Sequence, residues 1–333
     1  MKGPVNYFTA KGSATRVPGV SASRVVIALG GNAMTGPDGS ATVEAQERAV
    51  ATAMDAVADL VAAGTDVVLT HGNGPQVGNL LVKNELAADV VPPVPLDWCG
   101  AQTQATIGFL VLDALEAALA ARGSERRVAA LITRTLVDPD DPGFRRPTKP
   151  VGRYVPRERA QALIAHGETW EDRGEKGWRR VVASPEPLEV LDAPAVLALL
   201  DAGFVVVAAG GGGIPHTRQP DGSVHGISAV LDKDLTAALL ARTVGADVLV
   251  IATDVEHAVL DFGTDHARPL GRVTPAELRS YASAGQFASG SMGPKVEAVV
   301  RFVERGGSRA VITSLDRISA AVTGEAGTVV EQG

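Results

Sequence analysis

Four glycine-rich turns carry the clearest chemical signal in this sequence. The first three follow apolar runs rich in β-branched residues, and we expect all four to stand at the ends of strands. Glycine lets backbone N–H groups approach a phosphate closely, and a following helix adds partial positive charge at its N-terminus. A single turn of this kind is equally typical of a tight turn with positive φ, whereas several favour a cradle for a chain of phosphates. The four turns are Gly30-Gly31-Asn32, His71-Gly72-Asn73-Gly74, Gly210-Gly211-Gly212-Gly213 and Gly290-Ser291-Met292-Gly293.

A phosphate cradle needs positive charge, yet no lysine follows the first turn as it would in a GxxxxGK(S/T) P-loop. Three lysines farther along the chain stand in distinctive settings. Lys233 and Lys295 lie at predicted helix starts, and Lys149 lies between two nearby prolines that stiffen its backbone. We therefore predict that these three lysines supply the missing charge, whereas most other lysines of the chain are solvated surface groups.

Two aspartates bracket one of these lysines, in the stretch "LDKDLT". Carboxylates at a helix start are favoured by the helix dipole, so capping is one interpretation of Asp232 and Asp234. The other is that Asp234 holds two lysines apart and in register, and contacts Mg²⁺ through water. We interpret His71 as a hydrogen-bonding loop residue, because phosphoryl transfer requires positioning and charge neutralisation more than a general base. Cys99 is interpreted as a buried structural thiol.

The elements that must position these residues alternate between strands and helices. The strands read as continuous apolar runs, which is typical of a parallel sheet covered by helices on both faces. We predict strands over 24–31, 66–75, 126–137, 204–216, 246–255, 308–315 and 326–330. Helices are predicted over 43–64, 100–123, 193–203, 231–245, 274–285 (with Thr274 as N-cap) and 293–307.

Residues 138–185 differ from the rest of the chain. They are polar, rich in proline and charge, and contain two of the three tryptophans. Such a stretch is too long and irregular for an ordinary connection. We predict an inserted subdomain or lid here, with a decorated surface loop as the alternative.

Composition limits the remaining possibilities. The chain has 333 residues, a net charge of −7 and one cysteine. The negative charge argues against non-specific nucleic-acid binding, and the single cysteine excludes an internal disulfide framework. We find no apolar run of the ~20 residues that a membrane span needs, and no secretory signal. We therefore predict a cytoplasmic protein without nucleic-acid or membrane partners, and a flexible N-terminal extension over 1–22.

Several segments together resemble the carbamate kinase family of the amino acid kinase superfamily. The resemblance runs in order from about residue 24 to 330. Its most specific parts are "PTKPVG" and "GWRRVVASPEP", because they belong to a subdomain that sets carbamate kinases apart from their relatives. The other matching segments are "VVIALGGNAM", "LTHGNGPQVGNLL", "VVVAAGGGGIP", "ISAVLDKDLTAALLA", "ASGSMGPKVEAVVRFVE" and "AVITSLDRISAAVTGEAGTVV".

The resemblance implies a fold and a reaction. The fold is an open three-layer α/β/α sandwich around a mainly parallel eight-stranded sheet. One domain would span 23–333, with the protruding subdomain at about 138–185 and the nucleotide-binding half mainly in 204–333. The reaction is reversible, Mg²⁺-dependent phosphoryl transfer between ATP and carbamate, which gives ADP and carbamoyl phosphate. In many bacteria it runs towards ATP at the end of arginine fermentation. A homodimer is also implied.

The resemblance assigns roles to single residues. Lys149 would reach over the acyl phosphate. Lys233 and Lys295 would neutralise the phosphates during transfer, with Asp234 as the organising carboxylate between them. Mg²⁺ would be held mainly by the phosphates, without a direct protein ligand. Carbamoyl phosphate would be bound by Gly30, Gly31, Asn32, Gly72, Asn73 and Gly74. The nucleotide would be bound by Gly211, Gly212, Lys233, Asp254, Met292 and Lys295.

Some residues depart from the family pattern. Many relatives carry a lysine just before the first Gly-Gly, in the order K-L-G-G, where this chain has Ala28. Asp254 and His257 stand in an adenine-side segment that is more apolar in relatives, and Trp98 replaces a smaller residue. An alternative hypothesis is a related kinase of another small carboxylate. A nucleotide-binding protein without catalysis and an NAD-dependent dehydrogenase are further alternatives, and the latter lacks a G-x-G-x-x-G after the first strand.

Overall fold

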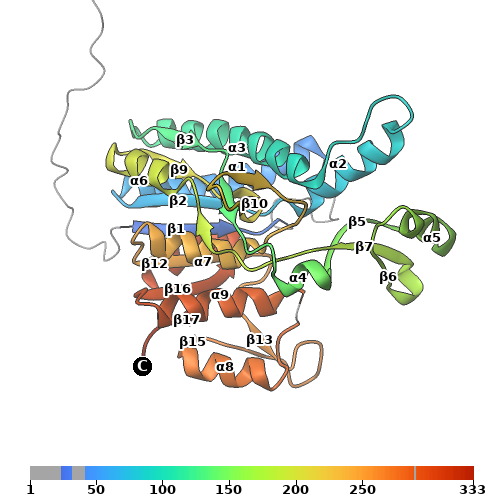
Figure 1. The fold of residues 1–333 in the computed structure, drawn as a ribbon. Helices are drawn as coiled ribbons and strands as arrows, with labels where there is room; N and C mark the ends of the chain where they lie inside the picture. Colours follow the sequence, from blue (N-terminus) through green and yellow to red (C-terminus); the bar gives the residue numbers. More distant parts are fainter. Residues whose placement is uncertain (1–23, 32–41, 289) are drawn as a thin grey trace, which may run out of the picture.

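The computed structural model describes residues 24–31, 42–288 and 290–333. Its centre is an eight-stranded sheet in which every neighbouring pair is parallel except β16 with β17. The family fold expected from the sequence is therefore confirmed (Figure 1). In spatial order the strands are β15 (Arg272–Val273), β17 (Thr328–Val330), β16 (Arg309–Ser314), β12 (Val248–Thr253), β1 (Arg24–Leu29), β2 (Asp66–His71), β9 (Val205–Val207) and β3 (Val128–Ala130).

Helices cover both faces of this sheet. Successive side chains of a strand point to opposite faces, so β1 contributes Val25 and Ile27 to one core and Val26 and Ala28 to the other. The first core lies under α1 (Val43–Ala62), α3 (Leu96–Ala121) and α10 (Ile318–Thr323). The second lies under α6 (Ala193–Asp201), α7 (Lys233–Thr243), α8 (Pro275–Ser283) and α9 (Met292–Glu304). The continuous apolar runs of the sequence follow from burial on both faces.

Smaller sheets lie beside the sandwich. One joins β11 (Val224–Gly226), β10 (Ile214–Arg218), β4 (Arg134–Leu136) and β8 (Glu189–Val190). Another joins β5 (Lys149–Val155), β7 (Trp178–Val182) and β6 (Trp170–Asp172), and it projects from the body together with α5 (Arg157–Ala165), as Figure 1 shows. The remaining elements are α2 (Gly74–Ala87), α4 (Pro142–Arg145), the hairpin strands β13 (Val259–Leu260) and β14 (Arg268–Pro269), and the 3-10 turns η2 (Gly174–Lys176), η3 (Gly210–Gly212) and η4 (Leu315–Arg317).

Several sequence predictions need correction. The single strand predicted over 204–216 is β9 of the main sheet and β10 of a smaller sheet, with the turn η3 between them. The glycine turn that begins at Gly290 follows α8 and not a strand. The single strand predicted over 126–137 is two strands, because the chain leaves the main sheet after β3 and joins the β4 sheet. At the break, the amide of Thr133 donates to the side chain of Gln104 instead of to a strand, at 2.8 Å. The loop predicted after β2 is the start of α2, in which Gly74 and Pro75 occupy the first helical positions. Thr274 caps α8 as predicted, in a capping box with Glu277.

Helix α3 bears on the expectation that the chain has no membrane partner. Among the described residues, α3 is the one helix long and apolar enough to cross a membrane by length and composition. The sequence analysis predicted a helix over 100–123 but did not count it as a possible membrane span, because Asp113 and Glu116 interrupt its apolar run. Core helices of globular proteins meet the same criteria, and Ile107 and Leu115 of α3 pack with α1 in the first core.

Candidate active site

A cavity of about 610 Å³ opens at the carboxyl ends of β1, β2 and β12. These strands are neighbours, with β1 between the other two. From β1 the chain continues to β2 on one side of it, whereas the neighbour on the other side, β12, comes much later in the sequence. Open α/β sheets bind ligands at such a switch point in strand order. Most of the site residues predicted from the sequence line this cavity: Gly30, Gly31, Gly72, Asn73, Gly74, Lys149, Gly211, Lys233, Asp234, Asp254 and Lys295.

Two predicted residues do not line the cavity, and a third cannot be placed. Asn32 is outside the described residues. Gly212 is buried against Leu231, and a Cβ at its position would lie 2.7 Å from the Leu231 Cβ, so it does not face the cavity. Met292 begins α9 but packs beside the second core and does not line the cavity.

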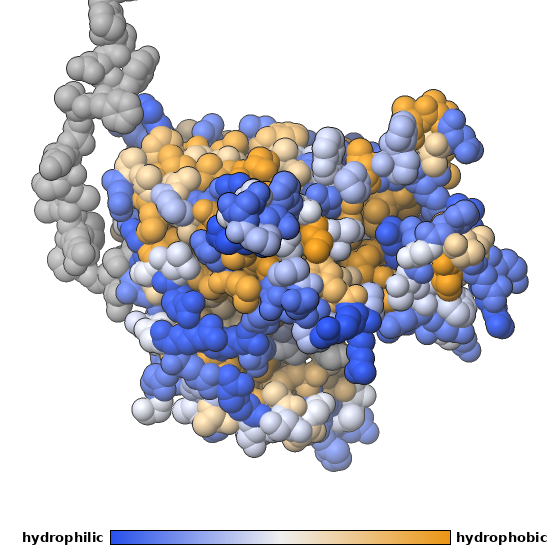
Figure 2. Space-filling view, in the orientation of Figure 1, coloured by the Kyte–Doolittle hydropathy of each residue, from blue (hydrophilic) through white to orange (hydrophobic). Residues whose placement is uncertain are grey.

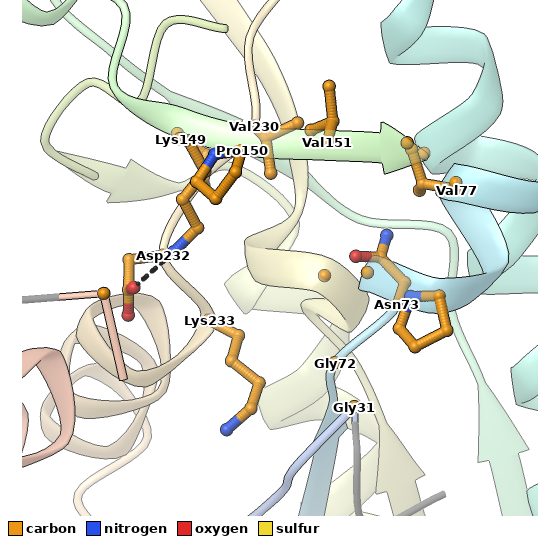
Figure 3. Close-up of a pocket in the computed structure, with 18 of the residues that line it drawn as sticks. Gly31, Gly72, Asn73, Val77, Lys149, Pro150, Val151, Val230, Asp232 and Lys233 are labelled. Carbon is orange, nitrogen blue, oxygen red and sulfur yellow. Dashed lines mark hydrogen bonds and ion pairs between the residues drawn. The ribbon is translucent and has the colours of Figure 1, made fainter. Parts of the chain in front are cut away.

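The glycine turns meet one another at close range (Figure 3). A Cβ on Gly72 would lie 2.5 Å from the amide nitrogen of Gly31, and one on Gly211 would lie 2.1 Å from the Asn73 side chain. A side chain at Gly72 would therefore require a backbone shift, and one at Gly211 would displace the side chain of Asn73. Two of the predicted phosphate donors are already engaged, because the Gly30 amide donates to Ala252 and the Gly72 amide donates to Leu29. A bound phosphate must therefore be contacted by groups of this wall other than these two amides.

The three predicted lysines line the cavity with two aspartates. The Asp234 carboxylate accepts from both Lys233 and Lys295, the latter at 3.0 Å from Nζ to Oδ2. Lys149 comes from β5 of the projecting sheet and donates to Asp232 at 2.9 Å (Figure 3). Asp232 also caps α7 by accepting from the amides of Asp234 and Leu235. Asp234 therefore pairs with two lysines, whereas Asp232 both caps α7 and pairs with Lys149.

Burial makes these charges interdependent. The side chains of Lys233, Asp234 and Lys295 are 11%, 5% and 13% exposed. Burial is the largest influence on Lys233 and lowers its pKa, against the opposing attraction of Asp234. Burial also raises the pKa of Asp234, but the two lysines more than offset this and hold it below its usual value. The carboxylate therefore stays ionised between two ammonium groups.

His71 lies directly beneath the cavity floor. It is 2% exposed, and burial lowers its pKa to about 4, with a smaller contribution from the charge of Lys233. The neutral ring donates from Nδ1 to the carbonyl of Gly72 at 2.9 Å. A neutral, internally bonded histidine fits the predicted hydrogen-bonding role rather than a general base.

Buried polar side chains hold the four-glycine turn, and the sequence analysis did not identify them. The turn begins at Ala209, which has a left-handed φ of 53° that only tertiary contacts can maintain in a non-glycine residue. The Thr133 hydroxyl accepts from the Ala209 amide at 2.6 Å, and the Thr70 hydroxyl donates to the Ala209 carbonyl at 2.8 Å. Gln104 donates to the carbonyl of Gly210 at 2.9 Å. Two isolated threonines and one glutamine, which come from a strand, a loop and a helix, give no sequence signal for this role.

Other cavity residues were also missed. Arg153 and Arg179 line it from the projecting sheet, and Thr253 lines it at the end of β12. Thr253 donates to the carboxylate of Asp254 at 3.0 Å. Asp232 also lines the cavity; the sequence analysis considered it as a helix cap but did not predict its pairing with Lys149.

Comparisons with known proteins agree on one family. The amino acid kinase family model matches residues 23–314. The carbamate kinase of Thermococcus kodakarensis is 46% identical over 313 residues, which are 92% of this chain and 98% of that protein. The carbamate kinase-like protein YahI of Escherichia coli is 44% identical over 309 residues, which are 91% and 97% of the two chains.

A solved structure shows the same likeness in three dimensions. The carbamate kinase from Giardia lamblia bound to AMP-PNP matches with a TM-score of 0.88 and 38% identity, over 94% of this chain and 100% of that one. Sequence, fold and cavity therefore converge: the chain belongs to the amino acid kinase family, among its carbamate kinases and carbamate kinase-like proteins.

Proposed function

We propose that the protein is a carbamate kinase, which transfers a phosphoryl group reversibly between ATP and carbamate, so that carbamoyl phosphate and ADP give ATP and carbamate. The observation that carries the proposal is the set of three lysines on one cavity at the switch point of the sheet. Two of them share the Asp234 carboxylate, and Lys149 pairs with Asp232. The names of relatives that cover nearly the whole chain support the same substrate.

The geometry suits phosphoryl transfer. This reaction requires in-line positioning and neutralisation of charge on the transferred group, with little acid–base chemistry. Lys233, Asp234 and Lys295 together carry one net positive charge, held in place where water is largely excluded, so its effect on a phosphoryl group is stronger than in solvent. We infer that Lys233 and Lys295 hold the phosphates in transfer. Lys149 covers the acyl phosphate from β5, as part of a lid built from residues 138–185.

We place the two ligands at opposite ends of the cavity. Carbamoyl phosphate lies against Gly31, Gly72, Asn73 and Gly74, and the nucleotide extends towards Asp254 and the start of α9. Gly211 packs on Asn73, so its position favours the acyl end over the nucleotide end assigned to it from the resemblance. The proposal for nucleotide contacts therefore rests on Lys233, Lys295 and Asp254.

The proposal includes Mg²⁺ with ATP or ADP. Magnesium prefers oxygen ligands and is usually held by substrate phosphates, waters and one or two carboxylates. The described residues hold no cluster of three or more His, Cys, Asp or Glu side chains able to bind a metal. Asp234 and Asp254 are carboxylates of the cavity wall that fit contact with its water shell. The bound ion would supply further neutralisation of phosphate charge.

We further propose a homodimer, with α3 and β3 as its interface. Trp98 and Phe109 of α3 are 60% and 51% exposed, and Ile132 beyond β3 is 52% exposed. Gly108 of α3 approaches Ala130 of β3 closely, so these groups share one edge. Figure 2 shows apolar side chains along the edge that carries α3. Because β3 is the last strand of the sheet, it also offers unpaired backbone groups to a second copy.

The setting of the enzyme is part of the proposal. Cys99 is the single cysteine of the chain and is buried as a free thiol, which suits the reducing cytoplasm. A carbamate kinase working there towards ATP would act in arginine catabolism. The predicted extension over 1–22 lies outside the described residues.

The test mixes the purified protein with MgADP and fresh carbamoyl phosphate, and measures ATP in a coupled assay. We expect ATP from the wild type and about 10²–10³-fold less from Lys233→Ala, because one cation on the transferred group is lost. Lys83→Ala, which removes an exposed lysine of α2, is the matched control. Because one relative is named only carbamate kinase-like, a panel of acyl phosphates runs in parallel. ATP from another acyl phosphate but none from carbamoyl phosphate would favour the alternative carboxylate kinase.

A further inference from the structure

A short buried chain of hydrogen bonds fixes the side chain of Asn73. The Asn73 amide nitrogen Nδ2 donates to the Thr103 hydroxyl at 2.9 Å, and that hydroxyl donates to the carbonyl of Gly100 at 2.7 Å. Thr103 is 2% exposed and Asn73 is 8% exposed. The chain links α3 to the loop that precedes α2, at the wall of the cavity.

These two hydrogen bonds determine the orientation of the Asn73 side-chain amide. A threonine hydroxyl has one proton, and here it goes to Gly100, so Thr103 can only accept from Asn73. The group that faces Thr103 must therefore be the NH₂ group, and the oxygen Oδ1 must point elsewhere. Figure 3 shows that oxygen turned towards the space that separates Asn73 from Lys149 and Asp232. The wall thus presents a hydrogen-bond acceptor to the ligand.

Gly211 keeps this arrangement in place. The Gly211 backbone lies so close to the side-chain amide of Asn73 that a Cβ on Gly211 would be 2.1 Å from Nδ2 and 2.7 Å from Oδ1. The amide is therefore packed between the four-glycine turn and Thr103. Rotation of the side chain to present NH₂ to the ligand would place Oδ1 against a hydroxyl that has no proton to donate.

We propose that Thr103 is a positioning residue for substrate specificity: it orients Asn73 so that Oδ1 accepts a hydrogen bond from the amino group of the acyl substrate. The inference rests on the proposed function and deepens it. Carbamoyl phosphate carries an amino group where acetyl phosphate carries a methyl group. A methyl group cannot donate, so the buried acceptor is left unpaired and the analogue is rejected.

The orientation also sets how the substrate lies. An oxygen of the carbamoyl group would be repelled by Oδ1, because both are acceptors. The amino group therefore faces Asn73, and the oxygens of the substrate face the lysines and the remaining backbone amides. Thr103 itself lies behind Asn73 and need not touch the ligand.

The experiment compares carbamoyl phosphate with acetyl phosphate as phosphoryl donors to MgADP. The readout is the ratio of their kcat/KM values, which a merely structural defect would leave unchanged. In Thr103→Val, which keeps the shape but removes the acceptor, we expect the preference for carbamoyl phosphate to fall about tenfold, the loss of one oriented hydrogen bond. Thr103→Ser, which keeps the hydroxyl, should retain the preference.

Thr328→Val is the matched control. Thr328 is fully buried and its hydroxyl also makes two hydrogen bonds, but it lies in β17 outside the cavity. We expect its ratio to equal that of the wild type. An unchanged ratio in Thr103→Val, or a parallel loss with both donors, would overturn the inference; Thr103→Ala gives the same comparison where the valine variant does not fold. Absence of ATP from carbamoyl phosphate with the wild type would instead refute the proposed function itself, and the inference with it.

Discussion

Replacing Asp234 with asparagine tests the charge arrangement most directly. The change keeps the size of the side chain and removes its charge from between Lys233 and Lys295. At an effective dielectric constant of about 20, two unit charges 3.0 Å apart, as in the Lys295 pair, attract by roughly 5 kcal/mol before solvation costs. Because the carboxylate is also buried, its removal leaves two ammonium groups without a compensating charge. We expect this to lower the free energy of unfolding by about 3–5 kcal/mol.

The protein can relieve this cost by losing a proton. Burial already lowers the pKa of Lys233, and Asp234 is the main group that opposes the effect. In Asp234→Asn the pKa of Lys233 therefore falls further, and the lysine becomes neutral at a lower pH. Since Lys233 acts in its protonated form, activity is lost as the pH rises through its pKa. We expect turnover near neutral pH to fall by about 10²–10³, and the alkaline limb of the pH profile to move to lower pH.

The assay is ATP formation from carbamoyl phosphate and MgADP, measured as a pH series for the wild type and the variant. Asp192→Asn is the control, because it removes another aspartate from an ion pair, with Arg134 at 2.7 Å, outside the cavity. It should lower stability without moving the alkaline limb. Wild-type turnover with an unshifted alkaline limb in Asp234→Asn would refute the reasoning.

Three further predictions follow from buried or exposed groups. The pKa of His71 is about 4 and that of an unfolded histidine is about 6.5, so the unfolded chain binds more protons between these values. Stability should therefore fall by about 3 kcal/mol as the pH drops through this window, and less in His71→Gln, as measured by urea unfolding at several pH values. Gly211→Ala should raise the KM for carbamoyl phosphate by displacing Asn73, whereas Gly222→Ala, at a positive φ with open space around it, should leave that KM unchanged. Phe109→Glu should shift a dimer to monomers in analytical ultracentrifugation, and an unchanged mass would exclude α3 from the interface.

The sequence was sufficient to predict seven of the eight strands of the main sheet and most of the helices that cover it, but not β15 or α10. Strands buried on both faces appear as apolar runs whatever their neighbours are, so β1, β2, β12 and β16 were found close to their actual bounds. The capping residue Thr274 was also predicted, because a cap depends on residues only three positions apart. The break within 126–137 was not predicted. It depends on Gln104 of α3, whose side chain accepts the hydrogen bond from the Thr133 amide in place of a neighbouring strand.

The same division holds for the site. Glycines after strands and lysines at helix starts are local patterns, so most of the site residues predicted from the sequence do line the cavity. It could not assign Lys149 to Asp232, which lies 83 positions away, or show that Thr103 fixes the amide of Asn73. It also gave no sign that Gly211 packs on the side chain of Asn73.

The sequence by itself determined which groups the protein has available: backbone turns at the ends of buried strands, and three lysines to match a chain of phosphates. Only the tertiary structure decided how those groups are paired, which amides are already used within the sheet, and which atom of Asn73 faces the ligand. The physical reason is that residue type and spacing specify local conformation and burial, whereas the partner of a buried charge or hydrogen-bonding group is set by contacts between segments far apart in the chain.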